Sequence, residues 1–95
     1  MGEVKELTIF FNAIRDDNRI GASHISLYMA LFQFYNLNQF RNPVLISRAS
    51  VMEIAKISGV ATYHKCMKDL VDFGYLNYLP SYNPAIHSQI TLLKI

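Results

Sequence analysis

The sequence lacks the features that mark secreted and membrane-spanning proteins. It has one cysteine, Cys66, so no disulfide can form within the chain, which is typical of a protein from a reducing compartment. The N-terminus MGEVKE has neither the basic nor the apolar segment of a signal peptide, and Glu6 stands where a myristoylation signal requires Ser or Thr. The longest nearly apolar run, residues 25–35, is shorter than the ~20 residues that span a bilayer. We therefore expect a soluble, cytoplasmic protein with no membrane partner.

Motifs for catalysis and cofactor binding are lacking as well. The sequence has no Gly-rich phosphate loop, no paired carboxylates at a plausible active site and no Ser-His-Asp pattern. Its three histidines, His24, His64 and His87, have no metal-ligand spacing with Cys66, and His64 would point away from that cysteine on a helix. Cys66 is expected to be a small buried hydrophobic residue. We expect a protein that is not an enzyme and needs no metal or other cofactor.

The apolar content is sufficient for one folded domain. Of the 95 residues, 52% are hydrophobic and 17% are charged, which is typical of a globular chain rather than a disordered one. The net charge of +2 is unevenly divided. Residues 1–39 contain three Lys or Arg and four Asp or Glu, whereas residues 40–95 contain six and three. The C-terminal part therefore has the positive charge that attracts nucleic acid.

Two helices are predicted before residue 40. A helix over residues 3–15 is indicated by four apolar residues spaced for one face, namely Val4, Leu7, Phe11 and Ile14. Ile9 and Phe10 lie off this face. Ser23 is a suitable N-cap for a second helix that runs to about Asn36 and is apolar nearly all round, as helices in the centre of a domain usually are. The excess of apolar residues on both helices suggests a homodimer interface.

A short strand over residues 44–46 and a third helix follow. Ser50, with a glutamate three positions later, fits a capping box for this helix, although Ser47 could begin it one turn earlier. Gly59 is expected to supply the left-handed backbone that ends the helix, and Val60 to pack into the corner that follows. The expected buried face of the helix consists of Val51, Ile54, Ala55 and Ser58.

The fourth predicted helix begins at Ala61 or Thr62, of which Thr62 is the better cap, and ends at Gly74. Its apolar stripe consists of Tyr63, Met67, Leu70 and Val71. We expect Tyr63 to be a core residue rather than a surface on which bases stack. The opposite face contains His64, Lys65, Lys68 and Asp72, which project together away from the core.

After Gly74 the pattern changes from a helical period to alternation. Residues 75–79 and 88–93 are rich in strand-forming residues, and the segment between them is rich in Pro, Asn and Ser. This combination predicts a β-hairpin directly after the fourth helix. The strand at residues 44–46 could pair with the hairpin, which would give a three-stranded sheet.

A helix-turn-helix followed by a β-hairpin is the plan of a winged-helix domain. The segments ISLYMALFQFYN, AKISGVATYHKCMKDLVDFGYL and YLPSYNPAIHS resemble the winged helix-turn-helix family, in particular small Bacteroidetes transcriptional regulators and mobile-element replication proteins. The resemblance covers roughly residues 23–93. It implies sequence-directed binding of duplex DNA, with the second helix of the motif in the major groove. We expect a single α+β, mainly helical domain of order α-α-β-α-α-β-β, in which residues 1–42 supply the N-terminal helices and residues 43–95 the helix-turn-helix and wing.

Within this frame, several polar residues are candidates for contacts to double-stranded DNA. Lys65 and Lys68 suit phosphates, and Thr62 or His64 could reach a base edge from the start of the helix. Arg48 at the start of the preceding helix could meet the backbone, with Arg41 as a further cation. The complete set of predicted contacts is Ser47, Arg48, Thr62, His64, Lys65, Lys68, Ser81, Tyr82, Asn83 and His87.

Other interpretations of the same residues remain open. The charged helix face could be an ordinary solvated surface, and the Pro, Ser and Asn residues of the hairpin could serve only the turn. A second hypothesis is a winged helix used for protein–protein assembly, with the aromatic helix 23–36 as its main surface. A third is the DNA-docking module of a replication initiator, which would need further domains. Salt-sensitive binding to duplex DNA separates the second hypothesis from the other two.

Overall fold

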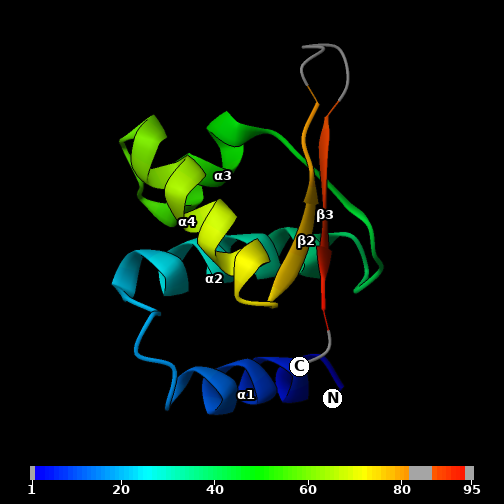
Figure 1. Ribbon diagram of the computed structural model, residues 1–95. Helices are drawn as coiled ribbons and strands as arrows, with labels where there is room; N and C mark the ends of the chain where they lie inside the picture. Colours follow the sequence, from blue (N-terminus) through cyan, green and yellow to red (C-terminus); the bar gives the residue numbers. More distant parts are fainter. Residues whose placement is uncertain (1, 82–86, 94–95) are drawn as a thin grey trace.

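The computed structural model describes residues 2–81 and 87–93, and this part of the chain contains four helices and three strands (Figure 1). Their order is the one predicted from the sequence, and the fold is α+β. The elements are α1 (Gly2–Ile14), α2 (Ala22–Leu37), β1 (Val44–Ile46), α3 (Arg48–Ala55), α4 (Val60–Asp72), β2 (Leu76–Leu79) and β3 (Ser88–Leu92). None of the described helices has both the length and the apolar character needed to cross a membrane.

The strands form one antiparallel sheet in the order β1-β3-β2, so the strand that comes last in the chain is the middle one. Ile90 of β3 lies opposite Val44 of β1 and Tyr78 of β2, and this row faces the core. The predicted pairing of residues 44–46 with the hairpin is therefore confirmed. The adjacent row of the sheet faces outward and consists of Leu45, Gln89 and Leu79.

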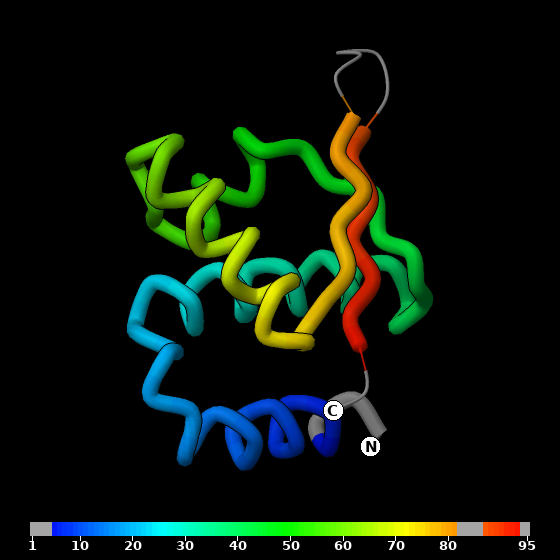
Figure 2. Tube along the Cα trace, viewed as in Figure 1, coloured from blue at the N-terminus to red at the C-terminus, as the bar shows by residue number. Residues whose placement is uncertain are grey.

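Helix α2 lies between α1 and the pair formed by α3 and α4 (Figure 2). It contacts α3, α4 and β1. Its buried residues are Leu27, Tyr28, Ala30, Leu31, Phe32 and Tyr35. These residues occupy more than one side of the helix, so α2 has neighbours on more than one face. The prediction of a central second helix is confirmed.

Helix α1 is joined to the core through Phe10. The Phe10 ring is fully buried and stacks on the ring of Tyr28 with 3.7 Å between their centroids, while the Tyr75 ring meets it edge-on at 5.6 Å. Phe11, expected on the buried face, is 44% exposed, so the predicted face is wrong at this position. Phe10 is the buried residue because its ring packs against those of Tyr28 and Tyr75. The spacing of apolar residues within α1 gives no sign of these two contacts.

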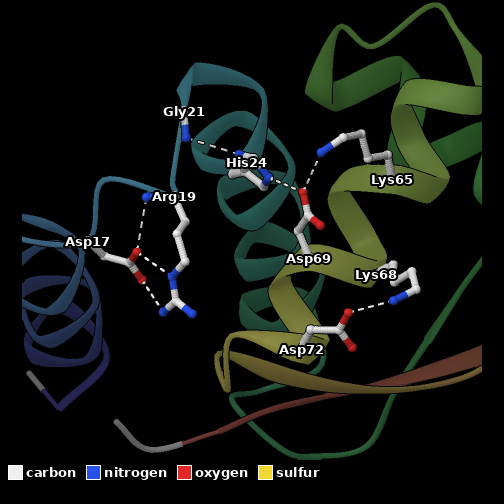
Figure 3. A network of polar contacts seen from close by, with 8 residues as sticks. All are labelled: Asp17, Arg19, Gly21, His24, Lys65, Lys68, Asp69 and Asp72. Atoms are coloured by element: carbon white, nitrogen blue, oxygen red, sulfur yellow. Dashed lines mark hydrogen bonds and ion pairs between the residues drawn. The ribbon is translucent and has the colours of Figure 1, made fainter.

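The loop between α1 and α2 is held by Asp17. The Tyr75 hydroxyl donates a hydrogen bond to Asp17 Oδ2 at 2.6 Å. The Arg19 guanidinium donates to both carboxylate oxygens at 2.8 Å (Figure 3), and it lies 4.1 Å from the centroid of the Phe73 ring. The hydrogen bonds from Arg19 and Tyr75 hold the pKa of the Asp17 carboxyl well below its usual range. These contacts fasten the loop to the junction of α4 and β2.

The starts of α2 and α3 are set by local hydrogen bonds. Helix α2 follows Gly21, whose N–H donates to His24 Nδ1 at 3.0 Å, so the predicted cap Ser23 is wrong. Helix α3 follows Ser47, whose Oγ accepts from the Ser50 N–H at 3.3 Å. The earlier of the two predicted starts of α3 is therefore correct. In both places a side chain satisfies a backbone N–H that the helix leaves free.

The turn between α3 and α4 differs from the prediction. Lys56, rather than Gly59, has the left-handed backbone that ends α3, with φ of 60°. Gly59 has φ of −92° and precedes α4, which begins at Val60. Thr62 therefore lies in the first turn of α4 and is not its cap. Val60 is 44% exposed instead of packed into a corner.

Helix α3 buries a narrower face than its sequence predicts. Val51 and Ala55 are buried as expected, but Ile54 is 47% exposed, and Ser58 lies beyond the end of the helix. Ile57 is buried instead. Its N–H donates to the carbonyl of Met52 at 3.1 Å, which turns the chain back over the helix end and brings this residue into the core.

Candidate nucleic-acid interface

Helix α4 has one buried face and one exposed face, as predicted. His64, Lys65 and Lys68 are exposed, and the two lysine side chains are 73% and 75% exposed. The buried residues are Tyr63, Cys66, Met67 and Leu70. The outer face therefore presents two positive charges and an imidazole to solvent.

The first turn of α4 is also exposed. Val60, Ala61 and Thr62 all lie at the surface, and the preceding residue Gly59 has no side chain that could bond the free N–H groups. The turn contains no acidic residue, so the partial positive charge of the helix N-terminus is not neutralised within the turn. This end of α4 combines small exposed side chains with a positive potential.

Each lysine of the exposed face is paired with an aspartate one turn later. Lys65 Nζ lies 2.9 Å from Asp69 Oδ2, and Lys68 Nζ lies 2.6 Å from Asp72 Oδ2 (Figure 3). These pairs are not among the predictions from the sequence, although a Lys–Asp spacing of four residues on one helix indicates them. Exposed ion pairs contribute little in water, so a phosphate oxygen can replace either carboxylate as the partner of its lysine.

Asp69 has a further partner that Asp72 lacks. His24 Nε2 of α2 lies 2.8 Å from Asp69 Oδ2, whereas Asp72 has no partner besides Lys68 among the described residues. The bonds from His24 and Lys65 lower the pKa of the Asp69 carboxyl. The sequence contains no local signal for a contact between residues 45 positions apart.

Arg48 begins α3, and its charge acts on a buried hydroxyl of α4. Burial raises the pKa of the Tyr63 hydroxyl to about 12, with a contribution from Tyr78 and an opposing one from the positive charge of Arg48. Arg48 forms no ion pair within the described residues. Ser47, also a predicted contact, is engaged locally, because its hydroxyl donates to Ser50 Oγ at 2.9 Å in addition to capping α3.

β2 ends and β3 begins at the same end of the molecule as α3 and the start of α4, whereas α1 lies at the opposite end (Figure 1). The Ser81 N–H donates to Ser88 Oγ at 3.0 Å, next to the end of β2. His87 is exposed directly before β3. The other two predicted hairpin contacts, Tyr82 and Asn83, lie outside the described residues.

The described ranges contain no group of three or more His, Cys, Asp or Glu side chains arranged to hold a metal ion. Cys66 is buried, as predicted, and burial raises the pKa of its thiol. Tyr63 is likewise a core residue, as predicted.

Comparisons of the chain with protein-family models, with curated proteins and with solved structures find no match.

Proposed function

We propose that the chain is a winged-helix domain that binds duplex DNA with α4 in the major groove, as a transcriptional regulator or a mobile-element accessory factor. The observation that carries this proposal is the exposed face of α4, with His64, Lys65 and Lys68, on a helix that starts at the end of the molecule where α3 begins and β2 ends. In this arrangement α3 and α4 are the helix-turn-helix, and β2 and β3 are the wing. The resemblance to winged helix-turn-helix proteins favours the same assignment.

Phosphate contacts supply most of the affinity in this proposal. Lys65 and Lys68 exchange their aspartate partners for phosphates, and each exchange releases a counterion from the DNA. Arg48, which forms no ion pair with a carboxylate in the described part of the chain, binds the DNA backbone from the start of α3. Its planar guanidinium can bond two phosphate oxygens at once. Arg41, exposed in the loop after α2, is a further candidate.

Base contacts supply the specificity. The major groove is ~12 Å wide and accepts one α-helix, whose N-terminal residues face the base edges. In α4 these residues are Val60, Thr62 and His64, all of them exposed. The hydroxyl and the imidazole can exchange hydrogen bonds with base edges, and Val60 can pack against a thymine methyl group. Ser81 and His87, which flank residues 82–86, are the described residues of the wing that we assign to backbone or minor-groove contacts.

The alternative of a protein-assembly module has less support. It requires the rings of α2 at the surface, but Tyr28, Phe32 and Tyr35 are buried within the chain. A replication-initiator module would use the same DNA contacts as the main proposal and differs from it only in needing additional domains.

A homodimer through α1 and α2 belongs to the same proposal. The exposed apolar side chains on these helices are Ile9, Phe11, Met29 and Leu37. A two-fold dimer would present two copies of α4 about one DNA turn, ~34 Å, apart and would favour a palindromic site. Sedimentation equilibrium at micromolar concentration measures the oligomeric state. A purely monomeric protein would show that the proposed dimer is wrong, and DNA binding would still be tested separately.

The proposal is tested with binding isotherms on duplex DNA at several salt concentrations. Lys65→Ala and Lys68→Ala should weaken binding to all duplexes and flatten the slope of log K against log salt by about 0.9 each. Lys5→Ala is the matched control, because it removes the same charge from an exposed position on α1, at the opposite end of the molecule. Asp72→Ala should leave binding unchanged or slightly tighter.

Specificity is measured with the same variants after selection of a preferred duplex. Thr62→Ala or His64→Ala should reduce the difference in binding free energy between the preferred duplex and a random one by about 1–3 kcal/mol. If both lysine variants keep the affinity and salt slope of the parent, α4 is not the DNA-contacting element. If the folded parent shows no salt-dependent binding to any duplex, the proposed function is wrong.

A further inference from the structure

His24 connects the start of α2 to the exposed face of α4 (Figure 3). Its Nδ1 accepts a hydrogen bond from the Gly21 N–H at 3.0 Å, so the proton of the neutral ring is on Nε2. That Nε2–H donates to Asp69 Oδ2 at 2.8 Å, and the same oxygen accepts from Lys65 Nζ at 2.9 Å. The imidazole is therefore held in one tautomer, and the carboxylate lies between α2 and a lysine of α4.

Lys68 and Asp72 provide an internal comparison with Lys65 and Asp69. The two pairs have the same residue types, the same spacing and nearly equal lysine exposure, 73% and 75%. They differ at the aspartate, because Asp69 is 19% exposed and bonded to His24, while Asp72 is 49% exposed. An effect of His24 on one lysine and not the other can thus be measured within a single helix.

We propose that His24 is a positioning residue for DNA binding, which holds Asp69 so that Lys65 can exchange this carboxylate for a phosphate. The proposal rests on the proposed function. When Lys65 turns to a phosphate, His24 still donates to Asp69 and compensates part of its charge. Without His24, Lys65 is the one partner of this carboxylate among the described residues, so the carboxylate holds the lysine more strongly and competes with the phosphate for it. Lys68 is independent of His24.

A double-mutant cycle measures this dependence. His24→Ala should weaken duplex binding by roughly two- to tenfold, the range that one hydrogen bond contributes. The loss should disappear when Lys65 is already alanine and should persist in full when Lys68 is alanine. A role of His24 in fold stability alone predicts equal losses in both backgrounds.

Two further variants separate positioning from capping. His24→Gln places an amide acceptor within reach of the Gly21 N–H and an amide donor toward Asp69, and glutamine at this helix position also completes a capping box. It should restore binding. Asp69→Asn removes the competing charge, so its binding should be at least as tight as that of the parent, and adding His24→Ala to it should change nothing. All isotherms are recorded below the melting temperature of the least stable variant.

The outcomes distinguish the two proposals. A loss that requires Lys65 and is rescued by glutamine supports the positioning role. Equal losses in the Lys65 and Lys68 backgrounds, or no loss in either, would overturn the positioning role while DNA binding by α4 stands. A folded parent protein that binds no duplex overturns both proposals together.

Discussion

Gly74 allows a prediction whose size can be worked out from the structure. It ends α4 with a left-handed backbone, φ 88°, as its place in the sequence predicts. The Tyr75 N–H donates to the Leu70 carbonyl at 2.9 Å and the Gly74 N–H to the Val71 carbonyl at 3.1 Å, which together form a Schellman motif. A Cβ added at Gly74 would meet no heavy atom within 4 Å outside its immediate neighbours. Only the backbone conformation therefore opposes a side chain there.

The left-handed conformation costs an L-residue about 1–2 kcal/mol. Replacing glycine regains about 0.4–1 kcal/mol, because the unfolded chain loses conformational freedom. Gly74→Ala should therefore lower the free energy of unfolding by about 1 kcal/mol. Gly74→Val should lower it further, because a β-branched side chain resists positive φ. In a chain of 95 residues, a loss of 1 kcal/mol corresponds to a fall in Tm of about 4–8 °C.

Thermal and urea unfolding followed by circular dichroism measure these differences. Gly59→Ser is the matched control, since Gly59 has φ of −92° and its added Cβ would lie 3.5 Å from Thr62 Oγ1, an ordinary contact. It should cost nothing, because serine is a preferred N-cap. Lys56→Gly is the opposite substitution, since it places glycine at a left-handed position with φ of 60°. It should raise the free energy of unfolding by about 0.5–1 kcal/mol. A Gly74→Val variant that melts with the parent would show that the end of α4 is not left-handed.

Phe10→Ala should lower the free energy of unfolding by about 3–5 kcal/mol, because its ring is fully buried. Phe11→Ala, at the exposed neighbouring position, should lower it far less, and the urea midpoints of the two variants measure the difference. The folded pKa of Asp17 is below its unfolded value, so its contribution to stability is present near neutral pH and is lost on acidification. Asp17→Asn should therefore melt lower near neutral pH but lose less stability than the parent below about pH 4 in melting curves. Burial raises the pKa of Tyr28, Tyr63 and Tyr75 to about 12, so the stability they contribute below pH ~10 should be lost as pH rises from 10 toward 12. The Tyr75→Phe variant should lose less stability than the parent between about pH 10 and 12. If the two proteins lose the same stability over this range, the assigned burial of the Tyr75 hydroxyl is wrong.

Periodicity predicted the parts of the fold that depend on a repeated pattern. The stripe of α4, the hairpin after Gly74 and the added strand β1 all follow from apolar spacing over several residues. Predictions of which of two nearby residues is buried, or which one ends a helix, were wrong where contacts outside the local pattern decide. The burial of Phe10 rather than Phe11 depends on two tyrosine rings far along the chain, and Lys56 takes the left-handed position three residues before the expected Gly59. Glycine is the preferred residue for such a backbone, but it is not required.

The candidate site was predictable at the level of a helix face and not at the level of its contacts. His64, Lys65 and Lys68 follow from the helical period, and they are exposed. The pairs between lysine and aspartate could have been found from their spacing. The hydrogen bond between His24 and Asp69 could not, because it depends on how α2 packs against α4.

The position of β3 in the sheet has a consequence for synthesis on the ribosome. β1 and β2 do not pair with each other, and each finds its hydrogen-bonding partner in β3, which is made after both. The helices can pack together while the sheet is still open, because α1 to α4 are all complete before β3 is made. Until residues 88–92 are inserted between them, β1 and β2 are unpaired edges with Leu45 and Leu79 at the surface, a template for association with other nascent chains. The sheet of this domain therefore cannot close until residues 88–92 have been synthesised.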